Sequence, residues 1–138
     1  GGVPRIAYHH RATKSLKLAE LDAAGNVSLR TLIAPDPAFS NDVVGQSIAL
    51  ASDCGGRLHV VYQRRISTDA QPNLLLAYAR ITATGLEHKQ FLPMTSSTAY
   101  QHYADAYGLD FYLAPDGKQY VAAQLNSIFG HGLYVATR

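Results

Sequence analysis

Short apolar runs alternate with polar and turn-forming residues along the whole chain. The apolar runs are rich in Val, Ile, Leu and Tyr, and clusters of Gly, Asp, Asn and Pro separate them. Short runs bounded in this way are typical of β-strands, and no long segment has the period of an amphipathic helix. The pattern therefore predicts an all-β protein with about ten strands.

One strand pattern recurs three times. Residues 2–8, 56–62 and 117–123 each open with Gly and continue as a strand, and each is followed, after a polar connection, by a second strand that also aligns. Upstream of the second and third copies, residues 47–53 align with residues 110–116. Self-similarity at a spacing of about 50 to 60 residues indicates a stacked repeat architecture.

The repeat unit is interpreted as a four-stranded antiparallel meander, since tight turns or polar loops join its strands. In the second copy, the strands are expected at residues 47–52, 57–63, 73–80 and 87–92. One such sheet cannot bury both of its faces alone, and β-propellers solve this problem by stacking several sheets around an axis. The predicted fold is therefore all-β, with β-propeller blades of four-stranded antiparallel sheets.

A single β-propeller segment is predicted over residues 1–138, with an incomplete ring in one chain. It comprises a partial first blade, a complete second blade and a partial third blade, at residues 1–33, 46–93 and 108–138. Strand patterns run almost to both ends of the sequence, which favours a processed chain or a piece of a longer one. We expect self-association or a partner segment to complete the propeller, because unpaired terminal strands are adhesive edges.

Two segments resemble blades of the bacterial sialidase-like (BNR-type) β-propeller superfamily: Ser-Ile-Ala-Leu-Ala-Ser-Asp-Cys-Gly-Gly-Arg-Leu-His-Val-Val-Tyr at 47–62 and Leu-Leu-Leu-Ala-Tyr-Ala-Arg at 74–80. The resemblance spans most of the chain. It implies a propeller fold and kinship with sialidases, polysaccharide lyases and lectin-like modules. The chain lacks the strict Asp-box, Ser-x-Asp-x-Gly-x-x-Trp, and contains no Trp, so the resemblance does not single out sialidase activity.

Composition narrows the classes of partner. Apolar residues make up 47% and charged residues 16% of the chain, a balance typical of a folded protein. The net charge of +2 lacks the basic excess of nucleic-acid-binding proteins, and no apolar run approaches the ~20 residues of a membrane helix. The single cysteine, Cys54, excludes an internal disulfide and a Cys-rich metal site. It leaves the compartment open, secretion included, and no cofactor is predicted.

The connections between strands divide into two groups. Tight turns rich in Gly and Asp, such as residues 53–56 and 115–117, are interpreted as scaffold. The connections expected at the opposite end of the sheets carry four of the six histidines and span residues 9–15, 34–42, 63–72, 93–105 and 124–131. This face is predicted to bind the ligand through His9, His10, Arg64, Arg65, His102, Tyr103 and His131.

These residue types suggest an acidic saccharide as the ligand. Arg binds planar carboxylates in a bidentate manner, and His carries protons near neutral pH. Adjacent His9 and His10 point to opposite sides of a strand, so no metal site is predicted. The predicted function is a carbohydrate-binding β-propeller segment for an acidic saccharide. The alternatives are part of a polysaccharide lyase or glycosidase propeller, and a protein-interaction scaffold, so the chain is not assigned as an enzyme or as a non-enzyme.

Interpretations that involve no ligand also remain open for these residues. The polar loops are equally consistent with solvated connections that bind nothing. His59 is interpreted as an alternating strand residue, and Tyr62, Tyr78 and Tyr134 as packing between blades. Cys54 lies in a scaffold turn with no base beside it, and no Gly-x-Ser-x-Gly motif is present.

Overall fold

All regular structure in the described part of the chain is β. The computed structural model describes residues 3–39, 41–68, 71–82, 85–93, 105–127 and 130–137. These ranges contain ten strands and no helix, which confirms the predicted all-β class. No segment within them is a helix of the length and apolarity that a bilayer crossing requires.

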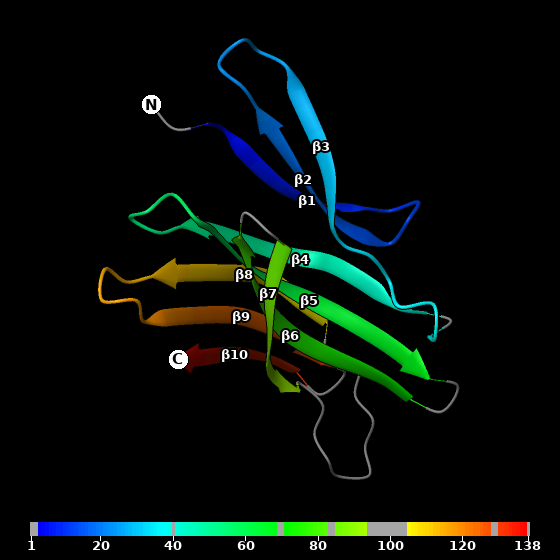
Figure 1. Ribbon diagram of the computed structural model, residues 1–138. Coiled ribbons are helices and arrows are strands. Elements are labelled where there is room, and N and C mark those ends of the chain that lie inside the picture. The colour runs from blue at the N-terminus through cyan, green and yellow to red at the C-terminus, as the bar shows by residue number, and fades with distance from the viewer. Residues whose placement is uncertain are drawn as a thin grey trace.

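The strands form three antiparallel sheets that follow one another along the chain (Figure 1). The first sheet comprises β1 (Arg5–His10), β2 (Ser15–Leu21) and β3 (Val27–Ile33). The second comprises β4 (Val43–Ser52), β5 (Leu58–Thr68), β6 (Gln71–Thr82) and β7 (Gly85–Pro93). The third comprises β8 (Asp105–Leu113), β9 (Gln119–Ser127) and β10 (Gly130–Thr137). Within each sheet every strand pairs with its neighbour in sequence, so each sheet is a meander.

The second sheet packs against both of the others. On one face, Val60 and Tyr62 of β5 pack against Leu16 and Leu18 of β2 in the first sheet. Successive side chains of a strand point to opposite faces, so Val61 lies on the other face of the same strand. There it belongs to a second apolar cluster, shared with the third sheet and made of Val61, Leu76, Tyr78, Phe111, Val121 and Ala123.

The strand pattern predicts that Ile48, Leu50, Val60, Leu74 and Leu76 are buried between sheets, and most of this core is confirmed. Val60 and Leu76 are fully buried, and Ile48 and Leu50 pack against the cluster between the first and second sheets. The side chain of Leu74 lies outside the described residues. Burying a Leu or Val side chain contributes about 1.5 to 3 kcal/mol, so these contacts are a main reason that the sheets stay together.

The backbone of the second sheet repeats in the third. Gly56 N–H donates to Asp53 O in the β4–β5 turn, and Gly117 N–H donates to Ala114 O in the β8–β9 turn, both at 2.9 Å. Both glycines have a positive φ, a conformation that side chains with a Cβ adopt at a cost. The turns thus confirm the alignment of residues 56–62 with 117–123. They match Asp53 with Ala114 rather than with Asp116, so the predicted alignment of residues 47–53 with 110–116 is wrong by two positions at the turn.

Each of β4 and β8 also carries a bulge at the same place in the repeat. The bulges contain Gly45 and Gly108, whose φ angles are 81° and 71°. A Cβ on Gly45 would lie 3.1 Å from Leu16 Cδ1. Glycine at this position therefore permits both the positive φ and the close approach of β4 to the first sheet.

Three predicted loops are shorter than expected, because the hairpins continue through them. β5 runs to Thr68 and β6 starts at Gln71, so most of the predicted loop 63–72 is paired strand, including Arg64 and Arg65. His10 ends β1, and His131 lies within β10. β4 and β8 start at Val43 and Asp105, earlier than the predicted blade boundaries 46 and 108. Ladder pairing satisfies backbone N–H and C=O groups, and polar side chains alternate within it as readily as in a loop.

Candidate functional site

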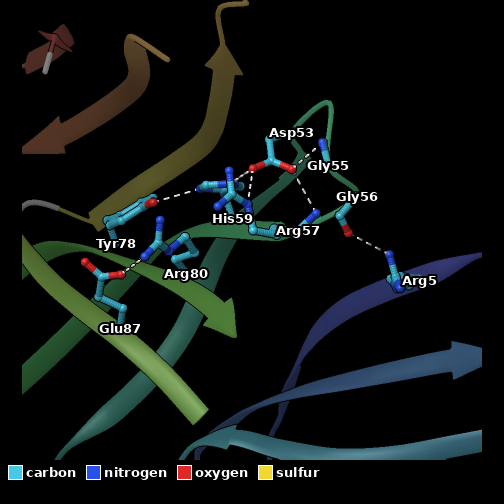
Figure 2. Close-up of polar contacts among 9 residues, drawn as sticks. All are labelled: Arg5, Asp53, Gly55, Gly56, Arg57, His59, Tyr78, Arg80 and Glu87. Atoms are coloured by element: carbon cyan, nitrogen blue, oxygen red, sulfur yellow. Dashed lines mark hydrogen bonds and ion pairs between the residues drawn. The ribbon is translucent and has the colours of Figure 1, made fainter. Parts of the chain in front are cut away.

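A cavity of about 400 Å³ lies between the second and third sheets. The β4–β5 and β8–β9 turns border it, and we call this end of the sheets the turn end. The opposite end, where His10, Asp42 and Arg65 lie, is called the loop end. The polar residues that line the cavity are Ser52, Asp53, Arg57, His59, Tyr78, Arg80, Glu87 and Gln119, and all but Ser52 and Gln119 are drawn in Figure 2.

The β4–β5 turn holds Asp53 as a carboxylate. Its Oδ1 accepts the backbone N–H groups of Gly55 and Arg57, each at 2.9 Å, and its Oδ2 accepts Arg57 Nε–H at 2.5 Å. The backbone hydrogen bond from Arg57 is the main cause that lowers the pKa of Asp53 well below its usual range, and side-chain bonds from Arg57 and His59 lower it further. Asp53 is therefore ionised at neutral pH and fixed in position.

His59 connects Asp53 to Tyr78 in one hydrogen-bonded chain (Figure 2). His59 Nε2 lies 3.4 Å from Asp53 Oδ2, and His59 Nδ1 lies 2.8 Å from Tyr78 Oη. An ionised carboxylate only accepts hydrogen bonds, so Nε2 of a neutral imidazole carries the proton here and Nδ1 accepts the Tyr78 hydroxyl. His59 and Tyr78 are only 5% and 4% exposed, so the hydrogen bond between their side chains is shielded from bulk water.

This sequence of hydroxyl, imidazole and carboxylate can move a proton. Tyr78 can pass its hydroxyl proton to His59 Nδ1, and the Asp53 carboxylate stabilises the imidazolium that forms. The same three groups also serve as a rigid wall of hydrogen-bonding atoms. The arrangement therefore supports either proton transfer or ligand binding at the cavity.

The far strands of the second sheet add an ion pair to the cavity wall. Arg80 of β6 and Glu87 of β7 are cross-strand neighbours and pair through Arg80 Nη2 and Glu87 Oε2. Within the described part of the chain, the buried Arg80 Nε–H meets no acceptor and the buried Gln119 Oε1 meets no donor. A buried polar atom without a partner costs about 1 to 3 kcal/mol. Neighbouring atoms cover both of these atoms, so they lie behind the surface of the cavity wall.

At the loop end, the two predicted histidines are engaged within the chain. His9 Nδ1 lies 2.8 Å from Val44 O, which ties β1 to β4. His10 Nδ1 lies 2.7 Å from Thr13 Oγ1 in the β1–β2 connection. The two rings bind different partners, in agreement with the expectation that they point to opposite sides of the strand.

Arg64 is engaged in the same way. Its Nε and Nη2 donate to Asp42 Oδ1 and Oδ2 at 3.0 and 2.6 Å, and Asp42 is almost fully buried. The hydrogen bond with Asp42 raises the pKa of Arg64, so this guanidinium stays charged. Asp42 Oδ2 also accepts the backbone N–H of Asp36 at 2.6 Å. The pair therefore fastens the 34–42 connection to β5.

The structure describes only some of the other predicted site residues. Arg65 lies beside Arg64 in β5, is half-buried, and has no ion-pair partner among the residues described. His131 lies in β10 opposite Asn126, but its side chain is outside the described residues. His102 and Tyr103 also lie outside them. The structure thus brings His9 and Arg64 together through Val44, which pairs with Arg64 in the ladder.

The sequence interpretation missed the turn end. The turn at residues 53–56 is interpreted from the sequence as scaffold, and His59 and Tyr78 as strand packing, although residues 53–55, His59 and Tyr78 all line the cavity. One signal was present: His59 interrupts the apolar strand that follows an Asp-containing turn, and a polar side chain in such a strand needs a partner. The partner atoms come from another strand and from the turn, so spacing alone did not identify them.

No cluster of three or more metal-ligating side chains occurs in the part of the chain that the structure describes. No protein-family model and no curated protein matches the chain. The candidate site is therefore interpreted from the geometry and chemistry of its own residues.

Proposed function

We propose that the chain is a β-propeller segment that binds a saccharide in the turn-end cavity. The propeller part is supported by the repeated turn and bulge of the second and third sheets. It is further supported by β4, which lies against both β1 and β8, as expected when the first strands of successive sheets surround an axis. The sheets themselves pack face to face in chain order.

The polar lining of the cavity carries the saccharide proposal. His59, Tyr78, Arg80, Glu87 and Gln119 bring hydrogen-bond donors and acceptors to one cavity, and a sugar hydroxyl both donates and accepts. A volume of about 400 Å³ lies in the range of small-molecule sites. The four charged side chains of the wall, Arg57, Arg80, Asp53 and Glu87, balance in sign, which suits a ligand recognised mainly by its hydroxyl groups.

The expected preference for an acidic saccharide is best explained by Arg57. Its side chain is 60% exposed and is bonded to Asp53 through Nε, so the outer edge of the guanidinium faces outward for a ligand carboxylate. Arg64, the earlier candidate, uses both arms of its fork on Asp42. An exposed pair contributes little and is screened by salt, so Arg57 sets a modest preference rather than the bulk of the affinity.

Calorimetry with a galacturonic acid trisaccharide and its neutral galactose counterpart tests the proposal. Gln119→Leu removes the acceptor at similar size and should weaken binding of both sugars about tenfold. Arg57→Ala should weaken only the acidic sugar, by a few-fold at low salt. Arg65→Ala at the loop end is the matched control and should change neither. Unaltered binding by Gln119→Leu, or no binding of either sugar by the parent chain, contradicts the proposal.

A second candidate function, elimination on a uronic acid polymer, is favoured by the Tyr78–His59–Asp53 chain. The proton α to the sugar carboxylate passes to Tyr78 Oη as the tyrosine proton passes to His59. The C–O bond to the leaving sugar breaks as a C=C bond forms, and the departing oxygen takes a proton from Tyr78 Oη as the imidazolium returns its proton to the tyrosine. The ultraviolet absorbance of the unsaturated product should rise with the parent chain and with Tyr112→Phe, but not with Tyr78→Phe. A parent chain that binds the polymer without producing this absorbance is a binding module only.

A further inference from the structure

The first sheet exposes an apolar face on the side away from the second sheet. Ile6 and Leu29 are each 65% exposed and Val27 is 62% exposed. Ile6 and Leu29 both pair with Ala19, while Val27 pairs with Leu21. Cross-strand partners point to the same face of a sheet, so these side chains form one continuous patch. A shallow cavity of about 210 Å³ lies over part of it.

The repeat shows what such a face normally meets. The alignment of residues 2–8 with 56–62 puts Ile6 at the position of Val60, and the ladders then put Ala19 at the position of Ala79. In the second sheet, Val60 and Ala79 are fully buried because the first sheet covers them. Positions that are covered in the second sheet are therefore open in the first.

The third sheet has the complementary open face. Tyr112 and Val135 are each 60% exposed and Tyr120 is 38% exposed. Tyr112 and Tyr120 are cross-strand partners with ring centroids 6.1 Å apart. In the strand ladders, Tyr120 and Val135 occupy the positions that His59 and Tyr78 occupy in the second sheet. His59 and Tyr78 line the cavity between the second and third sheets. Tyrosine is enriched in the cores of protein interfaces.

From these two faces we infer that a second copy of this chain docks on each of them. The open face of the third sheet in one copy covers the open face of the first sheet in the other, and repeats the packing between successive sheets. The three described sheets of two copies make six, within the usual range of about 4 to 8 propeller blades. Each copy uses both of its open faces, so two equivalent contacts related by a two-fold axis close the ring. This inference rests on the propeller part of the proposed function.

Sedimentation equilibrium at micromolar concentration tests the dimer. The parent chain should have twice the 14.9 kDa mass of the monomer. Leu29→Glu and Val135→Glu, one on each open face, should each reduce it to the monomer mass. Ser28→Glu adds the same charge one residue from Leu29, on the opposite face of β3, and should stay dimeric. Circular dichroism of each variant checks that the β-structure is retained.

Mixing the two monomeric variants tests whether the third-sheet face of one copy meets the first-sheet face of the other. One chain then supplies an intact third-sheet face and the other an intact first-sheet face, so a mixed dimer that this one contact holds together should reappear, with lower affinity than the parent dimer. A monomeric parent chain overturns the inference, and so does a dimer that only one of the two substitutions disrupts. Saccharide binding by Leu29→Glu distinguishes the docking inference from the proposed binding site. If the parent chain is a monomer and Leu29→Glu still binds the trisaccharide, the docking inference fails and the binding site stands.

Discussion

The loop end and the turn end of the sheets carry the same kinds of side chain and use them differently. At the loop end, His9 and Arg64 form their hydrogen bonds with Val44 at the start of β4 and with Asp42 just before it. At the turn end, tight turns leave a cavity, and His59 and Arg80 line it. Residue type alone therefore does not locate a binding site; the decisive property is which polar groups remain available once the chain has folded.

The strongest test of this difference is Asp42→Ala. The substitution leaves Arg64 largely buried without its carboxylate, and the loss of one partner from a buried pair costs about 3 to 5 kcal/mol. We expect the free energy of unfolding in urea to fall by about 3 kcal/mol. Arg65→Ala, at the next position of β5, should change it by less than about 0.5 kcal/mol. Equal effects would mean that the Arg64–Asp42 pair does not hold the loop end together.

Leu76→Ala tests the core that both ends share. Leu76 is fully buried between the second and third sheets, so the loss of its side chain should cost about 2 to 5 kcal/mol once the cavity is included. Leu86→Ala is the control, since Leu86 is 37% exposed on β7, and it should cost much less. A change below about 0.5 kcal/mol for Leu76→Ala would remove this residue from the core.

Tyr78→Phe tests the hydrogen-bonded chain at the turn end with little change in packing. It removes the hydroxyl from His59 Nδ1 and should destabilise the protein by about 1 kcal/mol. Ser28→Ala removes a hydroxyl from an exposed side chain and should have no measurable effect on thermal unfolding. If both variants unfold at the temperature of the parent, the bond between Tyr78 and His59 contributes nothing to stability.

The pH dependence of stability tests the carboxylate in the turn. The hydrogen bonds from Arg57 and His59 lower the pKa of Asp53 in the folded protein, so the unfolded chain takes up its proton first as pH falls. The stabilisation is present above the ordinary aspartate pKa of about 4 and is lost as pH falls below it. Asp53→Asn should make the free energy of unfolding less dependent on pH between about 5 and 2. An unchanged slope would show that Asp53 is not held by these bonds.

Local patterns in the sequence predicted the strands, the sheets and most of the core, because alternation and turn residues are properties of neighbouring positions. The ends of the hairpins were less predictable, since polar residues such as Arg64 and Arg65 suit a loop and a paired strand equally well. The candidate site was the hardest part. Asp42 and Arg64 are 22 residues apart, and the cavity is lined by Gln119 of the third sheet together with His59 and Arg80 of the second.

A nuclear magnetic resonance titration is the most direct test of whether the ligand binds at the turn end. A galacturonic acid trisaccharide is added to the labelled parent chain, and the backbone amide shifts of both ends are followed in the same spectra. We expect saturable shifts of the backbone amides of Gly55, Arg57 and Gln119. The amides of Thr13, Val44 and Arg65 should change little. Shifts confined to the loop-end amides would contradict this expectation and would return the site to the face that the sequence first suggested.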